Sequence, residues 1–135
     1  MVKAWQKFEL LAMEIQKQLS PNSKLIKNFR VTGKDTKIKR EIDIAIFDQI
    51  GQIELFIAIE CKDHKRKIDV PLIEQFISKL NDIGADKGII ISRKGLTESA
   101  KRLAQKYNIV QYILINQKKE KYKLDLKIPV LYEVK

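Results

Sequence analysis

The chain has 135 residues, which fits one domain spanning residues 1–135, and its 44% apolar and 33% charged residues exclude a disordered chain. Lys and Arg total 27 against 17 Asp and Glu, so the net charge is +10, which favours a polyanionic partner, with nucleic acid the first candidate. The single cysteine excludes an intrachain disulfide and no apolar run reaches the roughly 18 residues of a membrane span, so we expect an intracellular, cytoplasmic protein.

The first half of the chain predicts one helix followed by an antiparallel meander. Apolar residues recur at spacings of three and four between residues 2 and 19, so we expect a helix whose buried stripe is Trp5, Phe8, Ala12, Ile15 and Leu19. A strand over residues 24–31, a basic loop over 32–40 and a strand over 41–47 are expected next. In that second strand, alternation places Ile42, Ile44 and Ile46 on one face and Asp43, Ala45 and Phe47 on the other.

Two strand-helix-strand units are predicted to follow. Gly51 marks a hairpin turn before a strand over residues 53–62, whose wholly apolar middle indicates a central position in a sheet. Asp69 is expected to cap a helix that begins near Pro71 and ends at Gly84. A buried strand over residues 87–92, a helix capped by Thr97 and a strand over residues 109–115 come next.

This order of elements predicts the α/β class, with a mixed β-sheet flanked by helices. The core, about residues 3–115, has the order αβββαβα plus a further strand. Residues 116–135 form a basic C-terminal tail with only weak patterning.

Three residues at the end of the predicted hairpin form a candidate catalytic group. Glu60 and Lys62 are two apart in a strand, so they share a face. If the hairpin closes through a two-residue turn at Gly51, residue numbers across it sum to 103, and Asp43 stands directly opposite Glu60. Two carboxylates at that spacing repel each other unless a cation lies between them.

A hard cation and the lysine together would supply the chemistry of phosphodiester hydrolysis. Mg²⁺ prefers oxygen ligands and uses one or two carboxylates, leaving its other positions for water and phosphate. Lys62 beside the pair would orient or help deprotonate the attacking water and stabilise charge in the transition state. The alternative interpretation is a surface cluster of salt bridges, because a short D…ExK pattern also occurs by chance.

The chain resembles the Mrr-like branch of the PD-(D/E)xK nucleases, which have the restriction-endonuclease-like fold. The resemblance runs from about Phe8 to Leu114, through the segments FELL, REIDIAI, IAIECKDHKRKIDVPLIEQF and IGADKGIIISRKGLTESAKRLAQKYNI. It implies a restriction-type endonuclease that cleaves DNA and leaves 5′-phosphate and 3′-hydroxyl ends. It also implies Mg²⁺ as the cofactor, with Mn²⁺ as a substitute, held by Asp43, Glu60 and the backbone carbonyl of Cys61, with Lys62 as the catalytic lysine.

The same resemblance adds two polar residues to the candidate catalytic set. Glu9, in the first helix, matches an additional acid of the family, and Gln75, in the helix after the core motif, matches a polar active-site position. For each, an ordinary solvated helix residue is about equally compatible with the pattern. The Cys61 side chain alternates away from the site and is predicted to be core, and His64 is predicted to be a solvated loop residue.

Three basic segments are candidate DNA contacts. The segments around residues 34–40 and 65–67 lie on either side of Asp43 and Glu60 in the sequence. The segment at residues 93–94 follows a predicted strand and precedes the start of a helix. Solvated loops are the alternative for each. The candidate DNA-binding residues are Lys34, Lys37, Lys39, Arg40, Lys65, Arg66, Lys67, Arg93 and Lys94.

Two other functions fit the same pattern. A Holliday-junction resolvase shares the fold, an acid in the first helix and the ExK strand, and would act on branched DNA as a dimer. A DNA-binding module that has lost catalysis would keep the basic charge, although the intact Asp43, Glu60 and Lys62 argue against it. A chain with one site needs a second copy, as in a homodimer, to cut both strands, whereas nicking does not.

Overall fold

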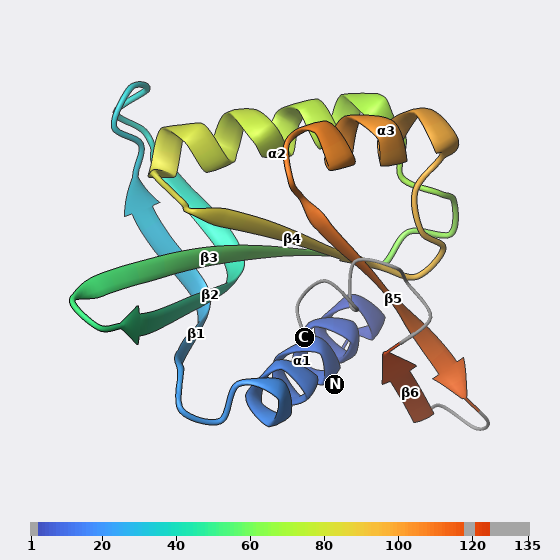
Figure 1. The fold of residues 1–135 in the computed structure, drawn as a ribbon. Coiled ribbons are helices and arrows are strands. Elements are labelled where there is room, and N and C mark those ends of the chain that lie inside the picture. The colour runs from blue at the N-terminus through green and yellow to red at the C-terminus, as the bar shows by residue number, and fades with distance from the viewer. Residues whose placement is uncertain (1–2, 118–120, 125–135) are drawn as a thin grey trace.

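The computed structural model describes residues 3–117 and 121–124, which form a mixed sheet with helices on both faces (Figure 1). Its strands are β1 (Lys24–Thr32), β2 (Lys39–Ile50), β3 (Ile53–Lys62), β4 (Lys87–Ser92), β5 (Val110–Gln117) and β6 (Lys121–Leu124). Its helices are α1 (Ala4–Leu19), α2 (Val70–Ile83) and α3 (Glu98–Lys106). No helix among these residues is both long enough and apolar enough to cross a membrane.

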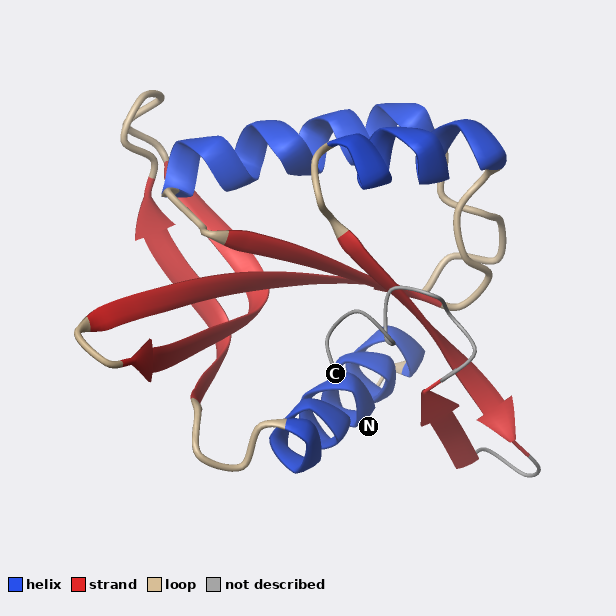
Figure 2. Ribbon diagram, viewed as in Figure 1, coloured by secondary structure: helices blue, strands red, loops and turns tan. Residues whose placement is uncertain are grey.

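The strands are hydrogen-bonded in the order in which they occur along the chain. The β1–β2, β2–β3 and β5–β6 pairs are antiparallel, whereas β3, β4 and β5 are parallel and are joined through α2 and α3. Helices α2 and α3 cover one face of the sheet and α1 covers the other (Figure 2). The predicted α/β fold is thus confirmed, while the predicted tail, residues 116–135, lies largely outside the described residues.

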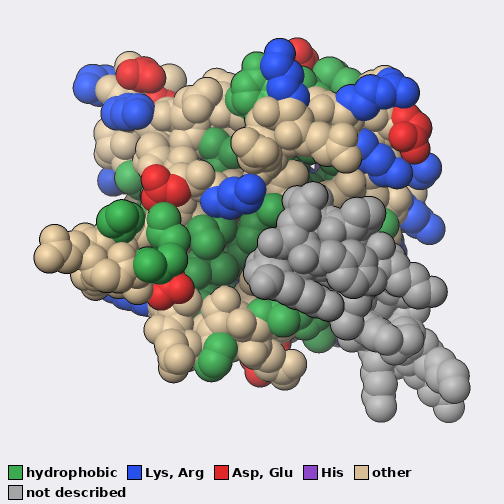
Figure 3. All heavy atoms as spheres, in the orientation of Figure 1, with side chains coloured by type: hydrophobic (Ala, Val, Ile, Leu, Met, Phe, Trp, Pro, Cys, Tyr) green, Lys and Arg blue, Asp and Glu red, His purple; other side chains and the backbone are tan. Residues whose placement is uncertain are grey.

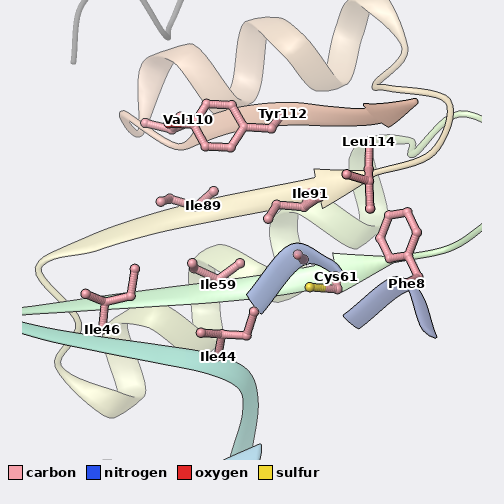
Figure 4. Close-up of a cluster of buried hydrophobic side chains, with 11 residues drawn as sticks. Phe8, Ile44, Ile46, Ile59, Cys61, Ile89, Ile91, Val110, Tyr112 and Leu114 are labelled. Atoms are coloured by element: carbon pink, nitrogen blue, oxygen red, sulfur yellow. The ribbon is translucent and has the colours of Figure 1, made fainter. Parts of the chain in front are cut away.

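Each face of the sheet has its own hydrophobic core. On the α1 face, Phe8 and Ala12 meet isoleucines of β2, β3 and β4 together with Tyr112 and Leu114 of β5 (Figure 4). On the other face, the core of α2 and α3 is built from Ile68, Ile73, Phe76, Ile90, Leu96, Ala100, Ala104 and Ile109. Strands β3 and β4 are therefore buried on both sides, which explains why their sequences are almost continuously apolar.

Capping residues fix the ends of α2 and α3 where the sequence predicts them. The Asp69 side chain accepts a hydrogen bond from the Val70 backbone N–H, and Gly84 ends α2 in a left-handed conformation (φ 73°). The Thr97 hydroxyl accepts a hydrogen bond from the Ala100 N–H at 3.2 Å and begins α3. Because α2 starts and stops at these positions, the helix presents a fixed set of side chains to the end of β3.

The predicted buried stripe of α1 is wrong at its two ends. Trp5 is 48% exposed and Leu19 is 53% exposed, whereas Glu9 and Gln16 are buried beside Phe8 and Ala12. The periodicity of apolar residues predicts which face of the helix is buried, but it does not show how far along the helix the sheet extends. Trp5 and Leu19 lie in the first and last turns of α1, beyond the part that the sheet covers, whereas Glu9 and Gln16 lie in the covered middle.

The predicted alternation of β2 is wrong at Ile42. Ile44 and Ile46 pack on the α1 face, but Ile42 packs with Ala45, Ala58 and Ile83 on the opposite face. The β1–β2 ladder keeps one register on both sides of this point, yet it lacks the pair between Asn28 and Asp43. Asn28 has a left-handed backbone (φ 54°). The alternation of side chains between the two faces of the sheet is therefore interrupted at this level in both strands, and Asp43 is the residue of β2 at the interruption.

Asp82 at the end of α2 anchors the basic loop between β1 and β2. Its carboxylate accepts hydrogen bonds from the Asp35 and Thr36 backbone N–H groups and from the Thr36 hydroxyl, and it pairs with Arg40 at 3.1 Å. These donors, first among them the Thr36 hydroxyl, lower the pKa of Asp82 to about 2. Gly33 runs so close to this group that a Cβ there would collide with the Asp82 carboxylate and the Thr36 hydroxyl.

We therefore predict that Gly33→Ala destabilises the protein by about 1–3 kcal/mol, the usual penalty for inserting a methyl group into a filled site. The midpoint of urea unfolding, followed by circular dichroism, measures this loss. Lys34→Ala is the matched control, because Lys34 is exposed and contributes only its backbone N–H to the Asp82 carbonyl. Equal midpoints for the two variants would contradict the close packing of Gly33 against Asp82.

Candidate functional site

The β2–β3 hairpin has the predicted register. Every pair from Ile50–Ile53 to Ile44–Ile59 sums to 103, so Asp43 and Glu60 come next on their two strands. At this point the ladder ends, and the Asp43 side chain replaces a backbone acceptor: its Oδ2 accepts a hydrogen bond of 2.7 Å from the Cys61 N–H. The two predicted acids are thus brought to the same end of the hairpin by the strands themselves.

Asp43 and Glu9 line a cavity of about 540 Å³ on the α1 side of the hairpin. Glu9 is only 8% exposed, and its Oε1 has no hydrogen-bond partner among the described residues. The Lys27 Nζ lies 3.6 Å from this oxygen. The structure therefore places the predicted additional acid next to Asp43, although α1 and β2 are far apart in the sequence.

Burial raises the pKa of Asp43 from its ordinary value of 3.8 to about 6. The negative charge of Glu60 acts in the same direction, and that of Glu9 adds to it, while the hydrogen bond from Cys61 opposes them. Lys62 opposes them more weakly. Asp43 is therefore a carboxylate whose charge is poorly compensated by the groups around it.

Glu60 and Lys62 line a second cavity, of about 330 Å³, beneath α2. The Glu60 carboxylate is buried, with Lys62 Nζ 3.5 Å from its Oε2 and Lys79 Nζ 3.0 Å from its Oε1. Gln75, for which the resemblance implies an active-site position, lines the same cavity, and so does Arg40. Asp43 and Glu60 thus open into different cavities, but they are close enough for the charge of one to raise the pKa of the other.

Lys79 is a site residue that the sequence interpretation missed. Its Nζ bridges the Glu60 carboxylate and the backbone carbonyl of Glu41, which it reaches at 2.8 Å. It thereby ties α2 to both strands of the hairpin. The available signal was its spacing, because Lys79 lies one helical turn beyond Gln75 and so shares its face.

The remaining predictions for single residues near the site agree with the structure. The Cys61 side chain is buried in the core of the α1 face, and burial raises the pKa of its thiol well above the ordinary value. A thiol in that state is a poor nucleophile. His64 is exposed in the loop after β3.

The basic candidates fall into two groups. The loops after β3 and β4 lie side by side, because these parallel strands end together, and Arg93 pairs with Asp63 across them at 2.6 Å. Lys65, Arg66, Lys67 and Lys94 are exposed on these loops. The other group is on and just after the loop between β1 and β2, at the upper left of the molecule in Figure 3: Lys34 and Lys37 are in the loop, whereas Lys39 and Arg40, predicted to be in it, begin β2. Arg40 is the member that also reaches the Glu60 cavity.

Buried carboxylate oxygens are the groups in this site that fit a divalent cation. Within the described residues, no group of three or more His, Cys, Asp or Glu side chains is gathered as a ready-made metal cluster. Two carboxylates and a backbone carbonyl, completed by water, are nevertheless a sufficient set for Mg²⁺. Burial and then the negative charges of Glu60 and Glu9 raise the pKa of Asp43, and a bound cation would offset these effects.

Comparison with known proteins places this chain in a family. The profile of the restriction endonuclease family Mrr_cat matches residues 3–119. Among solved structures, the protein of unknown function AF1548 is similar with a TM-score of 0.63 and 19% identity, over 78% of this chain and 55% of that one. The DNA modification-dependent restriction endonuclease AspBHI is similar with a TM-score of 0.54 and 18% identity, over 78% of this chain and 27% of that one.

These likenesses show the restriction-endonuclease-like fold that the sequence predicts. This chain spans about half of AF1548 and about a quarter of AspBHI, so it corresponds to one part of each. No curated protein sequence gives a significant match.

We predict that Asp43→Asn stabilises the metal-free protein by about 1–3 kcal/mol at pH 8. Because the pKa of Asp43 is raised by folding, the ionised carboxylate costs stability above pH 6, and the cost disappears below pH 4, where both states are protonated. The Asn oxygen can still accept the hydrogen bond from Cys61. Urea unfolding at several pH values in EDTA measures the difference, and a stabilisation that persists at pH 3.5 would contradict this cause.

Proposed function

Because the chain belongs to the restriction endonuclease family Mrr_cat, we propose that it is a metal-dependent endonuclease that hydrolyses phosphodiester bonds of DNA inside the cell. The observation that carries the proposal is the meeting of Asp43, Glu60 and Lys62 at one end of the β2–β3 hairpin. The net charge of +10 supports a nucleic-acid substrate.

Asp43, Glu60 and the backbone carbonyl of Cys61 would hold the metal, Mg²⁺ with Mn²⁺ as a substitute. When bound, the ion would polarise the phosphate and lower the pKa of a water molecule. The hydrogen bond from the Cys61 N–H holds the Asp43 carboxylate in place, and Lys79 holds that of Glu60. Both acids are thus oriented before any substrate arrives.

Lys62 supplies the positive charge next to the reacting phosphate in this proposal. Its ammonium lies 3.5 Å from Glu60 in the lining of the second cavity, where it can contact a water or a phosphate oxygen. Gln75, exposed on the wall of that cavity, can orient the water through its amide. Glu9 adds a third carboxylate beside Asp43 and is proposed to hold water next to the metal.

Phosphates of the DNA strands would be bound by the exposed basic side chains on the loops around the site. Such contacts position the duplex without reading its sequence, and they weaken as salt is raised. The proposed contacts are Lys34, Lys37, Lys39, Arg40, Lys65, Arg66, Lys67, Arg93 and Lys94. Arg40 and Arg93 are held by Asp82 and Asp63, so they would act from fixed positions.

We predict that the protein nicks or linearises supercoiled plasmid in Mg²⁺ and that EDTA abolishes the reaction. Glu60→Ala removes a metal ligand and Lys62→Ala removes the catalytic charge, so each should reduce cleavage by at least about 100-fold. Lys62→Ala should still bind DNA in a gel-shift assay. Lys106→Ala is the matched control, because that lysine is exposed at the end of α3, near the beginnings of the parallel strands, whereas Glu60 and Lys62 lie at the end of β3.

The same assay separates the rival functions. Full activity of Lys62→Ala would overturn the assignment of the catalytic lysine. Cleavage of a four-way junction without cleavage of linear duplex would favour a resolvase. Binding without cleavage in Mg²⁺ or Mn²⁺ would favour a module that binds DNA without cutting it. A linear product formed in one step would indicate a homodimer, since each chain has one site.

A further inference from the structure

Trp5 is a large aromatic side chain on the wall of the Asp43 cavity and not part of the core. It lies in the first turn of α1 and is 48% exposed. It lines the same cavity as Asp43 and Glu9, on the side of the hairpin opposite Lys62. Leu10 and Leu19 of α1 are exposed to a similar degree, but neither borders the cavity.

The groups around Trp5 suit a nucleic-acid strand. Lys27 and Arg30 line the cavity and carry positive charge, and the exposed Arg30 is paired with Glu41 at 2.8 Å. Gln6 adds an amide next to the indole. The carboxylates of Glu9, Glu41 and Asp43 line the same cavity, and Lys27 Nζ lies 3.6 Å from Glu9 Oε1. An aromatic face together with cations is the combination by which proteins hold single strands, with bases on the aromatic side chain and phosphates on the cations.

We propose that Trp5 stacks on an unpaired nucleobase next to the cleaved phosphate, so that the preferred substrate is DNA with unpaired bases at the cut. Within a duplex, a base is stacked between its neighbours and offers no free face to a side chain. A base that is already unpaired reaches the indole without the cost of extrusion from the helix. This inference rests on the proposed nuclease function, since it uses Asp43 to locate the cut.

The sequence contains one tryptophan, so tryptophan fluorescence, excited selectively over the four tyrosines, reports on Trp5 alone. We would titrate the protein in EDTA, which prevents cleavage, with a blunt duplex and with the same duplex carrying a short single-stranded gap. Stacking on a base quenches tryptophan emission. We expect quenching with the gapped DNA and little change with the blunt duplex, and fluorescence anisotropy of labelled DNA reports binding of both.

Three variants distinguish stacking on Trp5 from non-specific binding of DNA. Trp5→Leu should lose about tenfold in affinity for the gapped DNA and keep its affinity for the blunt duplex, in line with the usual contribution of one stacked base. Trp5→Phe keeps a π-face and should restore most of the loss. Leu10→Ala, at an equally exposed position on the same helix, should bind as the unmodified protein does. The slope of affinity against salt should stay unchanged in all three, because no charge is altered.

The results distinguish this inference from the function on which it rests. If the plasmid is nicked in Mg²⁺ but gapped DNA binds without quenching, or Trp5→Leu binds it as tightly as before, Trp5 has no stacking role and the nuclease proposal survives. If gapped DNA quenches the emission and Trp5→Leu weakens its binding as expected, but no metal gives cleavage, the stacking site stands and the catalytic proposal fails.

Discussion

The hydrogen bond from the Cys61 N–H to the Asp43 carboxylate is the contact on which the site depends. At this position the β2–β3 ladder ends, and a side chain takes the place of a backbone acceptor. The left-handed Asn28 on β1 allows both β1 and β2 to change faces at the same level. A regular sheet would have kept Asp43 in strict alternation, whereas the break places its carboxylate in the cavity shared with Glu9.

The two central acids are compensated very differently. Glu60 is buried but has two lysines within 3.5 Å, one from its own strand and one from α2. Asp43 has no ion pair of this kind, and burial, followed by the charges of Glu60 and Glu9, raises its pKa. At one end of the hairpin, the Glu60 carboxylate is therefore paired with two lysines, whereas the Asp43 carboxylate has little positive charge near it. This imbalance is what a divalent ion would relieve, and it is typical of functional sites.

Side chains of α2 hold the groups around the site in place. Lys79 joins this helix to both strands of the hairpin, and Asp82, one turn further, fixes the basic loop and Arg40. The caps at Asp69 and Gly84 set where α2 begins and ends, and so determine where these two side chains lie. On the other side of the hairpin, α1 contributes Glu9 and Trp5, the one buried and the other exposed.

The sequence by itself determined the elements, the register and the central residues. Strand periodicity placed β3 and β4 at the observed bounds, and the capping residues placed α2 and α3. The two-residue turn gave the register from Ile50–Ile53 to Ile44–Ile59, but the ladder ends there, and Asp43 and Glu60 face different cavities. These features are local, so a short stretch of sequence is enough to specify them.

Only the tertiary structure decided which groups from distant segments surround the acids. Lys79 meets Glu60 across 19 positions and Asp82 meets Asp35 across 47, and no local pattern records such pairs. The exposure of Trp5 and the face taken by Ile42 also depended on packing, since periodicity shows that a face is apolar but not how much of it the sheet covers. The sequence pattern therefore identified the candidate catalytic residues, and the packing of α1 and α2 against the hairpin decided which groups surround them.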